Sequence, residues 1–195
     1  MSQSNQLPAL ISSRICHDLA SPLMAIANGL EFLEMTGFAG TPEADLLADS
    51  VKSARARMEF FRIAFGAASP DGRIGARQAQ TALGDHFRDR KIDAVWDVSD
   101  DVSRVEAKRA FLLAQCCETA MPRGGSVRIT RPGAVWQIAA ETPVVKEVSE
   151  LWEVLQGGHA EIGSAHVHFL LAYDAADGRG IVVDLSEGAI TVRLG

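Results

Sequence analysis

The sequence has few aromatic residues, a net negative charge and no long apolar run, and each absence removes a class of function. Aromatic side chains make up 6% of the 195 residues, with a single Tyr. A surface that stacks single-stranded bases is therefore not expected. The net charge of −6 argues against a broad face for nucleic-acid phosphates. No apolar run approaches the ~18 residues that span a bilayer, so we expect no membrane contact.

Cysteine is also scarce. The three cysteines, of which Cys116 and Cys117 are adjacent, do not form an even set of spaced pairs. They are typical of reduced thiols in a cytosol rather than of a disulfide framework. The opening residues, MSQSNQLPAL, lack the basic region and apolar stretch of a secretion signal. We therefore expect a cytoplasmic protein whose partners are neither nucleic acid nor membrane.

Residues 1–70 predict a helical hairpin. Apolar residues spaced alternately by three and four mark one face of a first helix: Cys16, Leu19, Leu23, Ile26, Leu30 and Leu33. Residues 36–42 interrupt this pattern with a glycine for the helix end and with Thr41-Pro42 as N-cap and first helical residue. A second apolar face follows: Leu47, Val51, Ala54, Met58, Phe61 and Phe65. Two helices cannot bury both faces, so a second copy is expected to complete a dimeric four-helix bundle.

The turn-rich residues 69–72 mark the predicted boundary between two domains, 1–70 and 71–195. In the second domain the patterns predict helices at 74–87, 104–120, 143–155 and 165–176. Strands are predicted at 94–98, 126–130, 134–140, 180–185 and 189–194. Helices and mostly antiparallel strands in this order favour an α/β two-layer sandwich. The whole chain is therefore assigned to the α+β class.

His17 is the strongest candidate for chemistry. It directly follows the apolar position Cys16, which places it at the edge of the packed helix face. The neighbouring Asp18 can hold one imidazole nitrogen and leave the other as a nucleophile. Helical spacing places Ser13, Ser21, Met24 and Asn28 on the same side. An exposed, oriented imidazole suits nucleophilic phosphoryl transfer; the alternative is a solvated surface histidine beside an unrelated aspartate.

The run from His17 to Pro22, HDLASP, resembles the H-box of the dimerisation and phosphoacceptor domain of histidine kinases. That box has the form His-(Glu/Asp)-Leu-x-x-Pro and lies on the first helix of a hairpin. Pro22 removes one backbone hydrogen bond and loosens the helix turn beneath the histidine. The following break and second apolar helix agree with the same module.

The second domain resembles a kinase ATPase domain in layout but not in chemistry. Residues 112–125 resemble the kinase N-box, which ends in Pro-x-Gly-Gly, but its Mg²⁺-binding asparagines fall on Leu112 and Cys116. Neither side chain offers the oxygen ligands that Mg²⁺ requires. Pro143 replaces the glycine of the adenine-reading box, and residues 163–168 keep one glycine of the phosphate loop. Because residues 71–195 contain no other Asn-rich helix or Gly-rich loop, we expect no ATP binding.

An H-box hairpin joined to a nucleotide-deficient kinase-like domain resembles the ChpT-type histidine phosphotransferases of alphaproteobacterial phosphorelays. The resemblance runs from about residue 8 to the end, and it implies a homodimer whose second domain is similar to the Bergerat fold of histidine kinase ATPase domains. It implies that His17 carries a phosphoryl group, without ATP, between receiver domains of a hybrid histidine kinase and of response regulators. No cofactor or metal is implied, because Mg²⁺ belongs to the partner's receiver domain.

The expected roles around His17 follow from this resemblance. Asp18 orients the imidazole, and Ser21, one turn later, contacts phosphate oxygens or positions a water. Surrounding side chains are expected to contact a docked partner: Ser13, Arg14, Met24 and Asn28.

Three other functions stay open on the sequence alone. A histidine kinase with unusual nucleotide contacts would be labelled on His17 by ATP, and a non-catalytic binding protein for response regulators would tolerate His17→Ala. A phosphatase that uses Ser21 would dephosphorylate a receiver without a stable label on His17. The histidines at 159, 166 and 168 are interpreted as packing or surface residues, because ligand spacing is absent beside them.

Overall fold

The computed structural model describes residues 3–33, 35, 40–69 and 71–195. The chain divides into two compact units, Met1–Ala67 and Ala68–Gly195. Residues 36–39 of the expected helix end, which include Gly37, and the turn residue Pro70 fall outside the described residues. Among the helices of the described part, none is long and apolar enough to cross a membrane.

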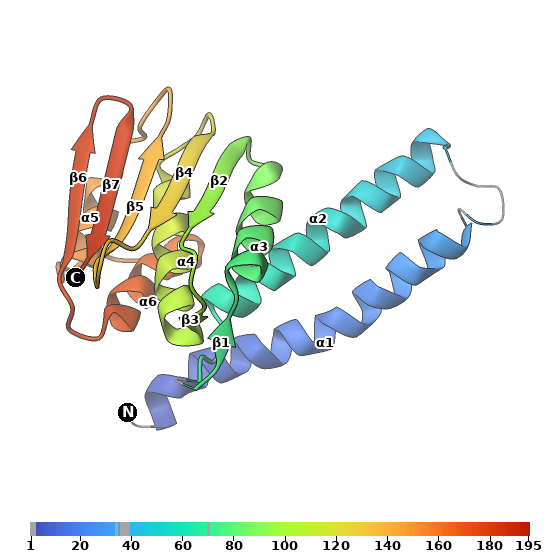
Figure 1. Ribbon diagram of the computed structural model, residues 1–195, viewed down its shortest axis with the longest axis horizontal. Coiled ribbons are helices and arrows are strands. Elements are labelled where there is room, and N and C mark those ends of the chain that lie inside the picture. The colour runs from blue at the N-terminus through green and yellow to red at the C-terminus, as the bar shows by residue number, and fades with distance from the viewer. Residues whose placement is uncertain (1–2, 34, 36–39, 70) are drawn as a thin grey trace. The chain divides into compact units, whose positions relative to one another are not determined.

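The first unit is a hairpin of two antiparallel helices, α1 (Gln3–Leu33) and α2 (Pro42–Ala64) (Figure 1). The start of α2 agrees with the prediction. The backbone N–H of Ala44 donates to the Thr41 side chain at 3.2 Å, and Pro42 lies in the first turn, where its missing N–H costs nothing. The longer α1 continues through Pro8 and Pro22 without ending.

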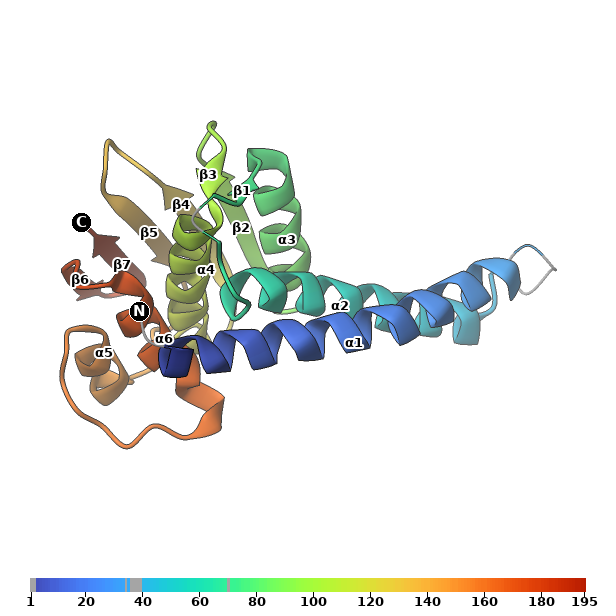
Figure 2. The ribbon, with the colours of Figure 1, turned by 90° about the horizontal axis from the view of Figure 1, so that it is seen from below.

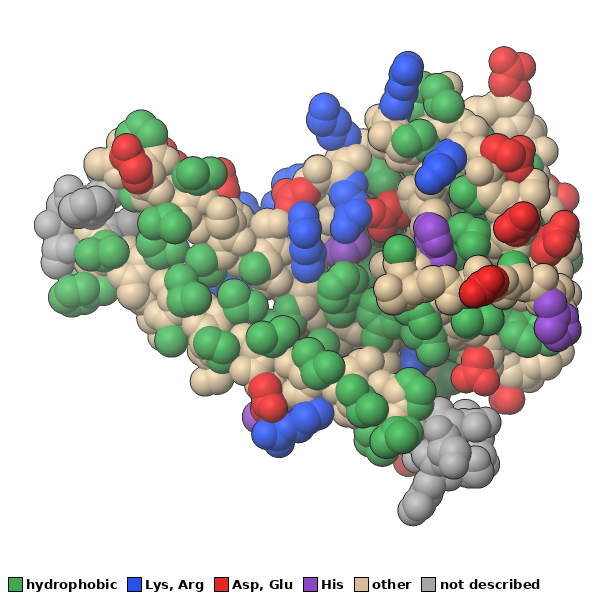
Figure 3. Space-filling view, turned by 180° about the vertical axis from the view of Figure 1, so that it is seen from behind, with side chains coloured by type: hydrophobic (Ala, Val, Ile, Leu, Met, Phe, Trp, Pro, Cys, Tyr) green, Lys and Arg blue, Asp and Glu red, His purple; other side chains and the backbone are tan. Residues whose placement is uncertain are grey.

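The face that α1 turns inward differs from the predicted one. Its buried or half-buried side chains are Ala9, Ser12, Ser13, Cys16, Ala20, Leu23, Ala27 and Leu30. Leu19, Ile26 and Leu33 of the predicted face are instead 52%, 52% and 45% exposed, and Leu47 of α2 is 52% exposed. Small side chains such as Ala27 let the helices approach closely, so larger residues one position away remain outside. Figure 3 shows these apolar side chains in green along the hairpin.

The second unit contains a five-stranded sheet in the order β2-β4-β5-β7-β6. These strands are β2 (Ile92–Asp97), β4 (Gly125–Thr130), β5 (Trp136–Glu141), β6 (Ile181–Ser186) and β7 (Ala189–Leu194). β2 and β4 are parallel, and every other neighbouring pair is antiparallel. A separate pair joins β1 (Arg73–Ile74) to β3 (Val102–Ser103). The predicted hairpins β4–β5 and β6–β7 are confirmed.

Helices cover one face of this sheet, as Figure 2 shows for α3 (Ala76–Arg88), α4 (Arg104–Thr119), α5 (Ser149–Leu155) and α6 (Val167–Ala176). The central helix α4 is buried on nearly all sides. The opposite face of the sheet is polar and carries exposed ion pairs such as Arg128 Nη1 to Asp97 Oδ2 at 3.1 Å. The predicted α+β class with a two-layer sandwich is therefore confirmed.

The free edge of β2 is capped by a side chain from α3. The Gln80 amide donates to the Ala94 carbonyl at 3.0 Å and accepts from the Trp96 N–H at 2.6 Å. One side-chain amide thus replaces the donor and acceptor that a neighbouring strand would supply. This arrangement shields an edge that would otherwise be open to pairing with another chain.

The predicted helix at 143–155 is wrong over its first half, because α5 begins at Ser149. The segment before it is held by backbone hydrogen bonds to other elements: Thr142 N–H to the Gly188 carbonyl and Lys146 N–H to the Ala120 carbonyl, both at 2.9 Å. The Lys146 N–H is a donor that a helix beginning at residue 143 would use internally. The helix predicted at 74–87 begins two residues later than expected, at Ala76, because Ile74 belongs to β1. A 3-10 turn, Ser164–His166, precedes α6.

Candidate functional site

His17 projects from α1 with 81% of its side chain exposed. Its Nδ1 lies 3.3 Å from Oδ1 of Asp18. The other carboxylate oxygen, Oδ2, accepts a hydrogen bond from Nε of Arg14 at 2.9 Å. The Asp18 carboxylate therefore bridges the imidazole of His17 and the guanidinium of Arg14 on an exposed face of the first unit.

This geometry determines which ring nitrogen of His17 is available for reaction. In the neutral imidazole, an Nδ1 proton donated to Asp18 leaves the lone pair on Nε2. The hydrogen bond from His17, followed by the charge of Arg14, holds the pKa of Asp18 below its usual value. The carboxylate is therefore ionised at neutral pH, and it can offset positive charge that develops on the ring when Nε2 attacks an electrophile.

The other predicted site residues divide into two groups. Arg14, Ser21, Met24 and Asn28 are exposed on α1. Ser13 is only half-exposed, and its hydroxyl accepts a hydrogen bond from the Ala67 N–H at 2.8 Å. The structure thus separates Ser13 from the exposed set, because its hydroxyl is used to join α1 to the segment that follows α2.

From the sequence, Arg14 is predicted to contact a partner, and no link between Arg14 and Asp18 is predicted. A signal for the link was present in the sequence. Arg14 and Asp18 are four residues apart, the spacing at which oppositely charged side chains meet on a helix. Together with the adjacent His17, they form one continuous hydrogen-bonded group.

The positions that correspond to the Mg²⁺-binding asparagines of the kinase N-box lie inside the core of the second unit. Leu112 and Cys116 of α4 are both 0% exposed. The Cys116 thiol lies 4.0 Å from the carbonyl oxygen of His168 in α6, and burial raises the pKa of this thiol well above its usual value. Neither side chain can therefore present an anionic or oxygen ligand to a metal ion.

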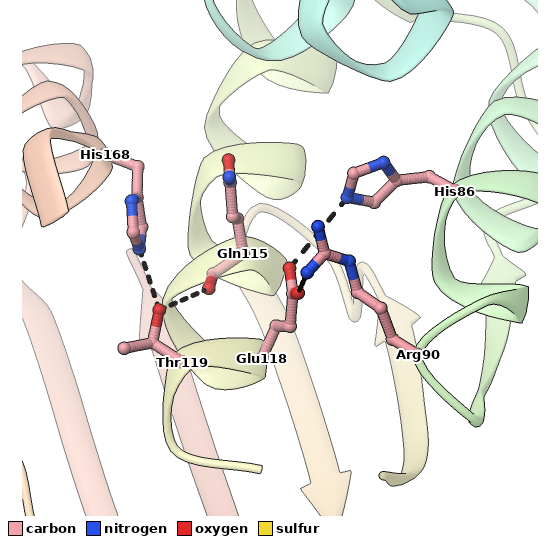
Figure 4. Close-up of polar contacts among 6 residues, drawn as sticks. All are labelled: His86, Arg90, Gln115, Glu118, Thr119 and His168. Carbon is pink, nitrogen blue, oxygen red and sulfur yellow. Dashed lines mark hydrogen bonds and ion pairs between the residues drawn. The ribbon is translucent and has the colours of Figure 1, made fainter. Parts of the chain in front are cut away.

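A cluster of polar side chains occupies the surroundings of Cys116 (Figure 4). The Thr119 hydroxyl lies 2.9 Å from Nε2 of His168 and donates to the carbonyl oxygen of Gln115 at 3.2 Å. Glu118 forms an ion pair with Arg90 and lies near His86, with 3.9 Å between Oε2 and Nε2. Burial lowers the pKa of His168 to about 4, so this ring is neutral at neutral pH. The Thr119 hydroxyl is thus used by the main-chain carbonyl of Gln115 and the ring of His168, and the Glu118 carboxylate by Arg90.

A metal site at the histidines 159, 166 and 168 finds no support in the geometry. In the described stretches of chain, no three His, Cys, Asp or Glu side chains are grouped so that they could hold a metal ion. His168 is 4% exposed and its ring contacts that of Phe169, at 4.8 Å between centroids. It is therefore a packing residue.

The Pro-x-Gly-Gly turn has a structural cause that involves no ligand. Gly124 and Gly125 have φ values of 76° and 140°. A Cβ on Gly124 would lie 2.2 Å from the Lys91 carbonyl oxygen, and one on Gly125 would lie 1.9 Å from that of Glu141. Backbone crowding at the start of β4 therefore requires glycine at both positions.

Comparison with known proteins agrees with this architecture. Residues 76–189 match the family model of the histidine phosphotransferase C-terminal domain. The protein phosphotransferase ChpT of Brucella abortus (strain 2308) is 38% identical over 130 residues, which cover 66% of this chain and 62% of that protein. The chain thus matches less than two thirds of that relative's length.

A solved structure is similar along the whole chain. The 1.7 Å structure of a bacterial phosphotransferase superimposes with a TM-score of 0.72 and 28% sequence identity, covering 100% of this chain and 98% of that one. The matched family domain includes the strands β2, β4, β5 and β6, the buried helix α4 and the Pro-x-Gly-Gly turn. The chain belongs to the family defined by the histidine phosphotransferase C-terminal domain.

Proposed function

We propose that this protein is a histidine phosphotransferase of a bacterial two-component phosphorelay, in which His17 carries a phosphoryl group between receiver-domain aspartates. The observation that carries the proposal is the exposed imidazole whose Nδ1 faces the Asp18 carboxylate, in a chain of the histidine phosphotransferase family. The names of its relatives, a protein phosphotransferase and a bacterial phosphotransferase, support the same activity.

The reaction needs little more than alignment. Nε2 of His17 attacks the phosphorus of an aspartyl phosphate, so the Nε2–P bond forms while the P–O bond breaks and the aspartate leaves with its electron pair as a carboxylate. Positive charge on the ring faces Asp18, and the proton stays on Nδ1. The reverse step delivers the phosphoryl group to a second receiver, whose acidic pocket supplies Mg²⁺. Ser21, exposed one turn after His17, can donate its hydroxyl to a phosphate oxygen.

Transfer without ATP is part of the proposal. It is supported by the complete burial of Leu112 and Cys116. These are the positions at which the kinase N-box, which this segment resembles, holds Mg²⁺. It is also supported by the mutual contacts of Thr119, His168 and Gln115 beside them. A nucleotide would have to break these contacts and would find no metal ligand in exchange.

The exposed face of the hairpin supports a homodimer. Large apolar side chains on the two helices are at least 45% exposed: Leu7, Leu10, Ile11, Ile15, Leu19, Met24, Ile26, Phe32, Leu33, Leu46 and Leu47. Apolar surface of this extent requires a covering partner. A second hairpin supplies a matching face and completes a four-helix bundle. Arg14, Met24 and Asn28, exposed around His17, are the residues proposed to contact a docked receiver.

A label-transfer assay tests this function. A phosphorylated receiver domain is mixed, without ATP, with the wild type, with His17→Ala and with the control His159→Ala, which removes an exposed histidine of the second unit. We expect acid-labile, base-stable label on the wild type and the control, and none on His17→Ala. Label from ATP alone would show a kinase instead. Absence of label with either donor would show a binding protein or, if the receiver still loses phosphate, a phosphatase.

A further inference from the structure

We infer that Arg14 is a positioning residue for phosphotransfer, which holds the Asp18 carboxylate in place against His17. The inference rests on the proposed function and adds a role to it. The two oxygens of Asp18 are divided between two partners: Oδ2 accepts from Arg14 Nε at 2.9 Å, and Oδ1 lies 3.3 Å from His17 Nδ1. Arg14 thus orients the group that orients the nucleophile.

The position of Asp18 on the helix explains why it needs such a partner. Its side chain is 51% exposed and adjacent in sequence to His17, so its rotation is not restricted by packing. Helical side chains lean toward the N-terminus, which directs Asp18 toward the preceding turn where Arg14 lies. The hydrogen bond from Arg14 selects the rotamer in which the second oxygen stays beside Nδ1. Without it, water competes for the carboxylate and the imidazole loses its fixed acceptor.

Arg14 also balances the charge around the nucleophile. A carboxylate without a cation beside it favours the protonated imidazolium, which has no lone pair to attack phosphorus. Arg14 and Asp18 together carry no net charge. From the packed helix α2, Glu59 and Arg62 interact electrostatically with Cys16, the residue before His17, and they form their own ion pair at 2.6 Å. The charge next to His17 that is sensitive to substitution is therefore that of the Arg14–Asp18 pair.

A positioning role and a docking role for Arg14 predict different kinetics. A residue that only contacts the receiver changes the receiver concentration that gives half-maximal rate, and leaves the maximal rate unchanged. A residue that acts through Asp18 changes the maximal rate and its pH dependence. Substitution of such a residue has no further effect on the maximal rate in a variant that lacks the charged carboxylate of Asp18.

The test measures label transfer from a phosphorylated receiver to the full chain, over a range of receiver concentrations and pH, for Arg14→Gln, Arg14→Lys and the control Arg128→Gln. The control breaks another exposed arginine–aspartate pair, in the second unit. We expect Arg14→Gln to lower the maximal rate about two- to fivefold, the effect of one exposed ion pair. The acid limb of the rate profile should move to higher pH, because the variant loses a positive charge near the ring. Arg14→Lys should restore both, and the control should match the wild type.

A double-mutant cycle with Asp18→Asn completes the test, and Arg14→Gln should have no further effect in that background. An Arg14→Gln enzyme with wild-type maximal rate and pH profile, or with only a higher half-maximal receiver concentration, would overturn the inference. Full additivity with Asp18→Asn would overturn it as well. Absence of label on the wild type would instead refute the proposed function, so the two failures are distinguishable.

Discussion

Acidification from about pH 7.5 to about pH 5 should destabilise the second unit through His168, and His168→Gln should remove this contribution. The ring is 4% exposed between α4 and Phe169, and burial lowers its pKa to about 4. Glu118 of α4 opposes this shift, and the nearby His166 adds to it. Because the unfolded chain binds a proton near pH 6.5 and the folded chain does not, the unfolded state gains stability as the pH falls.

The magnitude follows from the two pKa values. The contribution of the neutral His168 ring to the free energy of unfolding is complete above pH ~6.5. It decreases continuously until the folded ring itself protonates near pH ~4. A difference of about 2.5 units corresponds to about 3 kcal/mol in total, of which about 2 kcal/mol is lost by pH ~5. Gln is the substitution of choice because its amide can keep the contact with the Thr119 hydroxyl, 2.9 Å from the ring nitrogen, and cannot titrate.

Urea unfolding followed by tryptophan fluorescence measures this effect in the intact protein. All three tryptophans, Trp96, Trp136 and Trp152, belong to the second unit, so the signal reports that unit. Other groups titrate in the same range, and subtracting the curve of His168→Gln from that of the wild type cancels them. A difference that stays constant within about 0.5 kcal/mol between pH ~7.5 and pH ~5 would refute the reasoning.

Three further predictions concern other features of the structure. Gly125→Ala should cost more than about 3 kcal/mol in the same urea assay, because its Cβ would meet a carbonyl oxygen at 1.9 Å. Gly163→Ala, with open space around it, is the control, and equal stability of the two variants would contradict the crowding argument. Gln80→Ala should cost about 2 kcal/mol, because two edge groups of β2 lose their partners; a loss below about 0.5 kcal/mol would show that water replaces the amide. Ile26→Asp, at an exposed position, should convert a dimer to a monomer in light scattering while the helical circular dichroism is kept, and a wild type that is already monomeric would exclude the bundle.

The sequence predicted the helices and strands of the second unit well where a single pattern dominates. The strands β4 and β7 alternate between apolar and polar residues, because one face of the sheet is buried and the other is open. The start of α5 was missed for a tertiary reason. The residues before it bond to the carbonyls of Ala120 and Gly188, which lie far away in the sequence and leave no trace in local periodicity.

The hairpin shows a different limit. The predicted buried face of α1 includes Leu19 and Ile26, although these two lie outside and Ala20 and Ala27 occupy inner positions. A helix that packs on its own partner and also carries exposed apolar side chains shows two overlapping patterns. Periodicity alone does not separate them. Residue size does separate them, because small alanine side chains mark the close contact between the two helices of the hairpin.

The residues of the candidate site also differ in how far the sequence can predict them. His17 and Asp18 could be found from their order and their place on an amphipathic helix. The hydroxyl of Ser13 could not be assigned, because its partner, the Ala67 N–H, is 54 residues away and is brought near by the hairpin. Contacts within one helix turn can be inferred from spacing, while contacts that depend on the return of the chain require the fold.

The crowding at Gly124 and Gly125 has a consequence for how such proteins are recognised. These glycines are required because two carbonyl oxygens approach the start of β4, whatever the domain binds. A domain of this architecture needs both glycines in order to fold, whether or not it binds nucleotide. The Pro-x-Gly-Gly turn therefore cannot by itself distinguish nucleotide-binding domains from others. The positions that can distinguish them are those of Leu112 and Cys116, where the kinase box that this segment resembles has its Mg²⁺-binding asparagines.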